Sequence, residues 1–147
     1  MIWGVLQFPG SCDERDALNA CTIASGGFGG HAKLVWHEET DLSGFDGIVV
    51  PGGFSYGDYL RAGAIARFAP AMEAVADFAA AGGPVLGICN GFQVLCESGL
   101  LPGALLTNES TRFICRQGDL IVQESDSLFL TGYEAGERIS IPFKHQS

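Results

Sequence analysis

The sequence predicts an α/β fold in which helices cover both faces of a parallel sheet. Short apolar or β-branched runs alternate with segments that repeat apolar residues at helical spacing, and a parallel sheet with crossover helices requires this order. Glycine-rich loops follow two of the predicted strands, at the edge of the sheet where such folds build their sites. With 147 residues, the chain fits one domain covering positions 1–147.

The first half of the chain predicts three strands and one helix. Positions 4–8 and 32–36 are short apolar runs, and the second follows a glycine-rich turn. Positions 47–50 form a β-branched run that breaks into a glycine-rich loop, which indicates a third strand. The segment 13–24 is predicted to be a helix between the first two strands.

The second half predicts two helices and three further strands. Positions 70–81 repeat alanine and apolar residues at helical spacing, with Pro70 in the first turn and glycines just past the end. A strand is expected at 85–88, followed at once by a helix that Gly99 ends. Later strands are expected at 113–122 and 138–143, and a further helix could begin near Gly63.

Charge and composition exclude several classes of protein. The chain has 8 Lys and Arg against 17 Asp and Glu, a net charge of −9, so it lacks the basic patch that binding of nucleic acid requires. Charged residues and Pro70 interrupt the longest apolar stretch, 62–81, so no membrane segment is expected. The 5 cysteines are too scattered for a zinc site. We therefore expect a soluble cytoplasmic protein with reduced thiols and no bound metal.

The most informative stretch places Cys89 at a sharp strand-to-helix turn, with Gly87 and Gly91 two residues to either side. This is the layout of a nucleophile elbow, in which the side chains flanking the turn must be nearly absent. The thiol would lie near the positive end of the following helix, where an anion is stabilised. The backbone N–H of Asn90 would lie beside it and could stabilise an oxyanion. The alternative is a buried cysteine in the core, but a packed cysteine needs neither glycine.

A second motif supplies the other half of such a site. Gly52 and Gly53 follow the strand at 47–50, and their backbone N–H groups can come close to a ligand and complete an oxyanion hole. A phosphate-binding loop is excluded because neither this loop nor the glycine-rich segment 26–30 is followed by the Lys-Ser/Thr pair of nucleotide-binding loops.

Together the two motifs resemble those of class I glutamine amidotransferases, whose cysteine releases ammonia from glutamine. The residues that carry the resemblance are Pro-Gly-Gly at 51–53 and Gly-Ile-Cys-Asn-Gly-Phe-Gln at 87–93. The longer run at 51–67 is similar to the glutaminase subunits of phosphoribosylformylglycinamidine synthases, enzymes of purine synthesis. Supporting stretches lie at 8–13, 35–37, 99–103 and 113–116. The resemblance implies a flavodoxin-like three-layer sandwich.

The resemblance also implies a mechanism. Cys89 would attack the side-chain carbonyl of glutamine, expel ammonia and leave a thioester that water cleaves to glutamate. Gly53 and Asn90 would form the oxyanion hole. Three residues would bind the substrate: Gly52, Phe54 and Gln93.

Several of these residues have a structural interpretation as well. Gln93 can be an ordinary polar residue near a helix start, and Phe54 and Tyr59 can anchor the loop against the sheet. Arg61 and Arg67 can bind a partner or form the solvated face of a helix. The sequence leaves these alternatives open.

The family's partners follow from the same resemblance. Ammonia would pass to a large synthetase subunit, which uses ATP and magnesium to amidate formylglycinamide ribonucleotide. A small third subunit would bridge the two. This chain would hold no cofactor of its own.

The chain departs from the family pattern at its end. Class I amidotransferases complete a triad with a histidine and a glutamate in a His-Pro-Glu segment near the carboxyl terminus, and no His-Pro-Glu occurs in this sequence. The chain is therefore expected to be truncated and its activity to be doubtful. Three histidines are candidates for a replacement base: His31, His37 and His145. Glu38 would not orient His37, because adjacent residues on a strand point to opposite faces.

Two alternatives to an active glutaminase remain open. The chain can be a catalytically silent fragment or docking module of the same complex. It can also be a cysteine hydrolase or chaperone of the wider fold that carries a cysteine on an elbow. Selective reaction of Cys89 with an electrophile distinguishes them, because a formed site labels fast and an unformed one slowly.

Overall fold

A computed structural model describes residues 1–26, 29–123 and 127–146. The chain divides into two compact units, Met1–Leu105 and Leu106–Ser147. Each unit is described by itself below. The expectation of one amidotransferase domain over 1–147 stays a prediction.

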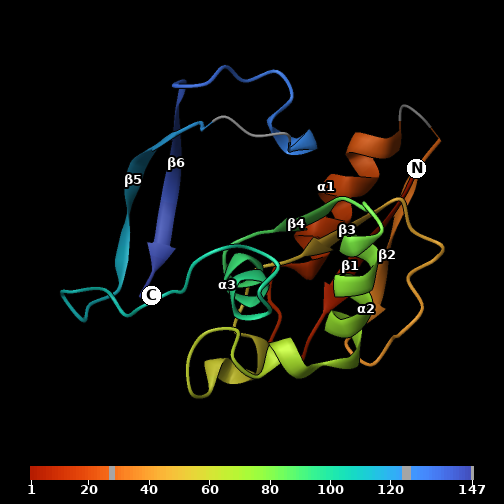
Figure 1. Cartoon of the computed structure of the whole chain (residues 1–147), viewed down its shortest axis with the longest axis horizontal. Coiled ribbons are helices and arrows are strands. Elements are labelled where there is room, and N and C mark those ends of the chain that lie inside the picture. The colour runs from red at the N-terminus through yellow and green to blue at the C-terminus, as the bar shows by residue number, and fades with distance from the viewer. Residues whose placement is uncertain (27–28, 124–126, 147) are drawn as a thin grey trace. The chain divides into compact units, whose positions relative to one another are not determined.

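The first unit is built on a parallel sheet (Figure 1). It has four strands in the order β2-β1-β3-β4, and every neighbouring pair runs parallel. The strands are β1 (Ile2–Gln7), β2 (His31–Trp36), β3 (Gly47–Val50) and β4 (Val85–Gly87). All four lie where the apolar runs predict them, with small shifts at their ends.

Helices cover both faces of this sheet. Three α-helices occur in the described part of the first unit: α1 (Glu14–Gly26), α2 (Pro70–Ala80) and α3 (Asn90–Glu97). α1 connects β1 to β2, and α2 connects β3 to β4. β1 and β3 form the centre of the sheet, and the two connections lead to opposite edges, β2 and β4. Since such crossovers are right-handed, α1 and α2 lie on opposite faces (Figure 1). This arrangement confirms the flavodoxin-like three-layer fold.

Strand alternation divides the core between the two faces. Ile48 and Val50 point to one face of β3, where they join Met72 of α2 and Val94 of α3 in a single buried cluster. Val49 lies between them and points to the face that α1 covers; it is 2% exposed. The short strand β3 is therefore buried on both sides, which explains its continuous apolar sequence.

The segment between β3 and α2 is a long loop with short 3-10 turns, η1 (Ser55–Asp58) and η2 (Ala66–Phe68). The helix that the sequence left open near Gly63 does not begin there. Gly63 has a φ of +78°, outside the helical region, and a Cβ there would lie 2.9 Å from the backbone N of Val94. The backbone of this loop thus approaches α3 too closely for a side chain at position 63.

The second unit contains an antiparallel pair of strands, β5 (Ile114–Ile121) and β6 (Arg138–His145). Its register pairs Ile114 with His145 and Ile121 with Arg138. A 3-10 turn, η3 (Leu128–Leu130), lies in the connection. Both strands are where the sequence predicts them.

The described residues contain neither a candidate membrane-spanning helix nor a candidate metal-binding cluster. Among them, no helix is long and apolar enough to cross a membrane. In the same residues, no group of three or more His, Cys, Asp or Glu side chains could hold a metal ion.

Candidate active site

Cys89 occupies the strand-to-helix turn in a strained conformation. It is exposed, it is the N-cap residue of α3, and its backbone has φ 52° and ψ −112°. A non-glycine residue seldom adopts this region, and such strain is typical of the turn that presents a nucleophile. The abrupt turn expected from the sequence is therefore present.

Close packing explains the two glycines that flank the turn. A Cβ at Gly91 would collide with the carbonyl oxygen of Val50, and one at Gly87 would lie 2.6 Å from Cδ1 of Leu95. The backbone of α3 thus rests directly on the end of β3. Neither position tolerates a side chain while Cys89 keeps this place.

The glycine-rich loop after β3 is pinned to the segment after β1. The carbonyl oxygen of Gly52 accepts hydrogen bonds from the backbone N–H groups of Cys12 and Asp13, each at 3.2 Å. The N–H of Phe54 donates to the carbonyl oxygen of Gly10 at 2.9 Å. Gly53 lies between these bonds with a φ of +140°, a backbone conformation that favours glycine.

The loop and the elbow meet at Gly52. The point where a Gly52 side chain would begin lies 3.4 Å from Cβ of Cys89 and overlaps Oδ2 of Asp13. Within the described residues, no backbone acceptor takes the N–H of Gly53 or of Asn90. These are the two donors that the sequence predicts for an oxyanion hole.

The side chain of Asn90 also takes part in the site, because its amide forms hydrogen bonds with the loop. Its side chain is 2% exposed and contacts the loop, since Oδ1 accepts from the N–H of Ser55 at 3.0 Å and from its hydroxyl at 2.7 Å. Nδ2 donates to Oδ1 of Asp58 at 3.0 Å and to Oε1 of Gln93 at 3.1 Å. Sequence reasoning missed Ser55 and Asp58. Their only signal was the presence of two polar residues in a loop otherwise made of glycine and aromatic residues.

The aromatic residue that anchors the loop differs from the two that the sequence offered. Phe54 and Tyr59 are 60% and 73% exposed, so neither is packed against the sheet. Tyr56 anchors the loop instead, because its ring packs on Phe8 and its hydroxyl lies 2.7 Å from Nδ1 of His37. A direct contact of Phe54 with a substrate stays a prediction.

The histidines considered as a replacement base lie in different surroundings. His37 follows β2 and contacts Tyr56 and Trp36 through its ring. His31 is the first residue of β2, on the strand at the far edge of the sheet from β4. His145 belongs to the second unit, at the end of β6. Of these, the structure ties His37 to the loop through Tyr56.

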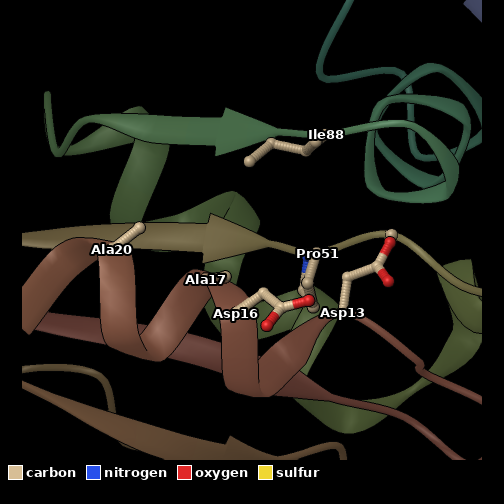
Figure 2. Close-up of a pocket in the computed structure, with 7 residues that line it drawn as sticks. Asp13, Asp16, Ala17, Ala20, Pro51 and Ile88 are labelled. Carbon is tan, nitrogen blue, oxygen red and sulfur yellow. The ribbon is translucent and has the colours of Figure 1, made fainter.

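A pocket of about 300 Å³ lies beside the elbow (Figure 2). It opens between α1 and the segment that follows β4, and its lining comes from three parts of the first unit. The lining residues are Asp13, Asp16, Ala17, Ala20, Pro51, Gly52 and Ile88. Gly52 and Ile88 adjoin the proposed oxyanion donor and the nucleophile, so the pocket borders the site.

Two carboxylates that hold the loop have shifted pKa values. Burial raises the pKa of Asp58, while the hydrogen bond from Asn90 opposes this shift. The hydrogen bonds from Arg61 lower the pKa of Glu97, whose carboxylate accepts from Nε at 2.7 Å and from Nη2 at 2.6 Å. The first carboxylate is therefore protonated more easily than usual, and the second less easily.

The cysteines differ in exposure. Cys12, Cys89 and Cys115 are exposed. Burial raises the pKa of the Cys21 and Cys96 thiols, so these two form the reactive thiolate less readily. Exposure alone does not single out Cys89, whereas its backbone geometry does.

Comparison with known proteins agrees with this geometry. Residues 3–147 match the family described as CobB/CobQ-like glutamine amidotransferase domain. The chain belongs to this family. The resemblance to glutamine amidotransferases is thereby confirmed over nearly the whole of this chain.

Individual relatives carry more specific names than the family does. The chain is 56% identical over 141 residues to the phosphoribosylformylglycinamidine synthase subunit PurQ of Rhodococcus jostii (strain RHA1), covering 96% of this chain and 61% of that protein. It is also 56% identical over 142 residues to the PurQ subunit of Synechococcus sp. (strain CC9605), covering 97% and 64%. The chain thus spans about three fifths of the length of these curated relatives.

A solved structure shares the fold. The structure of PurLQS from Thermotoga maritima contains a chain that matches with a TM-score of 0.88 and 43% identity. The match covers 99% of the present chain and 66% of that chain. This TM-score shows that the two chains share one fold over nearly the whole of the present chain.

Proposed function

We propose that this chain is the glutaminase part of a phosphoribosylformylglycinamidine synthase. Cys89 is the nucleophile, and it releases ammonia from glutamine for an ATP-dependent synthetase partner in purine synthesis. The observation that carries the proposal is the strained turn at Cys89, with φ 52°. Beside it lie the N–H groups of Gly53 and Asn90, which no backbone acceptor takes in the part of the chain that the structure describes. The names of the two relatives described above support the choice of this synthase.

The proposed reaction divides the hydrolysis into two steps. The Cys89 sulfur bonds to the amide carbon of glutamine, and the carbonyl oxygen becomes an oxyanion that Gly53 and Asn90 stabilise. The proton that the Cys89 thiol gives up passes to the amide nitrogen, the C–N bond breaks, ammonia leaves, and a thioester remains. Water attacks the thioester, which gives glutamate and restores the thiol. Gly52, Phe54 and Gln93 are proposed to bind the glutamine.

The remaining proposals concern the partners. A large synthetase subunit would receive the ammonia and would hold ATP and magnesium, and a small third subunit would bridge the two. The PurLQS structure supports an assembly of this kind. We further propose a cytoplasmic location, which the synthase role of the relatives supports.

Labelling with a chloroketone analogue of glutamine tests the function. Wild-type protein should carry one label on Cys89 and none on Cys12 or Cys115, although these two thiols are exposed as well. Excess L-glutamine should protect Cys89, whereas D-glutamine should not. Cys89→Ala is the control, and glutamate release is measured in the same samples with and without the synthetase subunit.

Each outcome supports a different interpretation. Selective labelling with glutamate release supports the glutaminase, and mutation of His37 would then test its role as base. Selective labelling without release in either sample indicates a docking module with a formed but silent site. Labelling spread over the three exposed cysteines would contradict the proposed function.

A further inference from the structure

The loop that carries Gly53 is fastened to α3 by buried polar contacts. We propose that Ser55, Asp58 and the side chain of Asn90 are positioning residues that fix the two oxyanion donors relative to one another. This inference rests on the proposed function, because it concerns how that site is held. None of the three side chains needs to touch glutamine to act in this way.

The orientation of the Asn90 amide follows from its partners. The backbone N–H of Ser55 can only donate, so the atom that it meets at 3.0 Å must be the amide oxygen. The Ser55 hydroxyl donates to the same oxygen at 2.7 Å. Nδ2 therefore faces the other way, where it meets two further acceptors.

Both of these acceptors are oxygens of the site. Nδ2 donates to Oδ1 of Asp58 at 3.0 Å and to Oε1 of Gln93 at 3.1 Å. The Asn90 amide thus uses both donors and both lone pairs while only 2% of the residue is exposed. A buried amide whose N–H and oxygen groups all form hydrogen bonds has one favourable orientation. Its hydrogen bonds in turn restrict the positions of the groups that it contacts.

The partners need such support, because the loop adopts strained backbone conformations. Tyr56 and Asp58 have φ values of 52° and 51°, and neither is glycine. Such residues remain in this region only where surrounding contacts over-determine it. The hydrogen bonds of Asn90 hold the first residue of this strained turn, Ser55, and its last residue, Asp58.

A second attachment fastens the far end of the loop. Arg61 donates two hydrogen bonds to the carboxylate of Glu97 at the end of α3, and Arg67 donates to the Glu97 carbonyl oxygen at 3.3 Å. Gly63 lies against the backbone of Val94 between these attachments. The loop and α3 therefore contact one another along the length of the helix.

The consequence concerns the oxyanion hole. Gly53 lies on the loop and Asn90 begins the helix, so any shift of one element against the other changes the separation of their N–H groups. Donors must lie within a few tenths of an ångström of the right distance from the oxyanion to stabilise it. Asn90 supplies one donor through its backbone and holds the other donor's loop through its side chain.

The test compares two serine-to-alanine variants of the full chain. Ser55→Ala removes the 2.7 Å hydroxyl bond to Asn90, while the Ser55 N–H still satisfies the amide oxygen. Ser98→Ala is the matched control, because its hydroxyl donates at 2.8 Å to the Val94 carbonyl oxygen within α3 and does not contact the loop. Three quantities are measured: amide hydrogen exchange over 53–60, Cys89 labelling by the chloroketone, and Cys89 alkylation by iodoacetamide.

We expect a specific pattern for Ser55→Ala. Exchange over 53–60 should rise about fivefold, and chloroketone labelling should fall by about the same factor, as loss of one buried hydrogen bond predicts. Iodoacetamide alkylation needs no oxyanion hole and should stay within about twofold of wild type. Ser98→Ala should leave the exchange and the chloroketone labelling unchanged.

The exchange measurement keeps the inference separate from the proposed function. If Ser55→Ala leaves exchange over 53–60 as in wild type, the positioning role is overturned whatever the labelling shows. If exchange rises and iodoacetamide and chloroketone rates fall together, the serine acts on the fold of the elbow, and the positioning role is likewise overturned. If exchange rises but wild-type Cys89 shows no selective chloroketone labelling, the proposed function fails and the attachment of the loop stands.

Discussion

At the scale of single residues, the ion pair of Arg61 and Glu97 joins the loop to α3. The Glu97 side chain is only 10% exposed, and both of its carboxylate oxygens accept from one guanidinium, the paired geometry that gives an ion pair direction. The guanidinium lowers the pKa of Glu97. Since Glu97 is the last residue of α3, the pair connects the loop to the end of the helix that Cys89 begins.

This lowered pKa predicts a pH dependence of stability. A carboxyl whose pKa is lower in the folded state contributes stability above its ordinary value, about 4.3, and loses that contribution as pH falls through the folded value. The free energy of unfolding of wild type should therefore exceed that of Glu97→Gln at pH 7, and the difference should shrink toward pH 3. Urea titrations at several pH values measure it.

Glu73→Gln is the control for this measurement, since Glu73 is an exposed carboxylate on α2. Its difference from wild type should not follow the same curve. A Glu97→Gln difference that stays constant between pH 7 and pH 3 would show that the ion pair contributes nothing through its charge.

At the scale of elements, the molecule depends on how closely α3 approaches β3. Gly91 is in the first turn of α3, and a Cβ there would collide with the Val50 carbonyl oxygen and lie 3.0 Å from that of Pro51. Both atoms are backbone, so neither can swing away as a side chain does. The direction in which Cys89 points is therefore set by contact between two backbones.

Gly91→Ala should destabilise the protein by about 3 kcal/mol or more, because the added methyl meets backbone that cannot move without shifting a strand. Gly26→Ala is the matched control, since Gly26 ends α1 with no described atom within 4 Å of its Cβ position. It should be neutral or stabilising by up to about 1 kcal/mol. Thermal and urea unfolding measure both, and equal effects would refute the packing argument.

Element-level patterns were also the part that the sequence could predict. The strand at 47–50 and the helix from Pro70 follow from β-branched residues and from proline placement, which are local properties. The sequence left open whether a helix begins near Gly63, because contact with α3 decides the backbone there. The bonds of Asn90 to Ser55 join residues 35 positions apart, and no local pattern encodes such a pair. The roles of the site residues remain predictions that the labelling experiments test.

At the scale of the whole molecule, the two units differ in what each can bury. Met1–Leu105 contains the four-stranded sheet and the buried cluster of apolar residues from strands and helices. In the described residues of Leu106–Ser147, the structure shows one pair of strands. A sheet of two strands alone is marginally stable in water. The first unit is therefore expected to carry most of the cooperative stability.

Separate production of the two units tests this expectation. A chain of residues 1–105 should unfold cooperatively in urea, with a midpoint close to that of the whole chain. A peptide of residues 106–147 should give the narrow amide spectrum of an unfolded chain by NMR. A well-dispersed spectrum from the peptide, or a non-cooperative transition in 1–105, would reverse the assignment.

The backbone at Cys89 has a consequence for experiment. With φ 52° and ψ −112°, the position suits glycine better than any residue with a side chain, so the thiol is held there against the preference of its own backbone. Cys89→Gly should therefore yield a more stable protein than the wild type, and an inert one. Cys89→Ala keeps a side chain in the same strained backbone conformation and loses only the sulfur. It is therefore the better inactive variant for comparison with wild type.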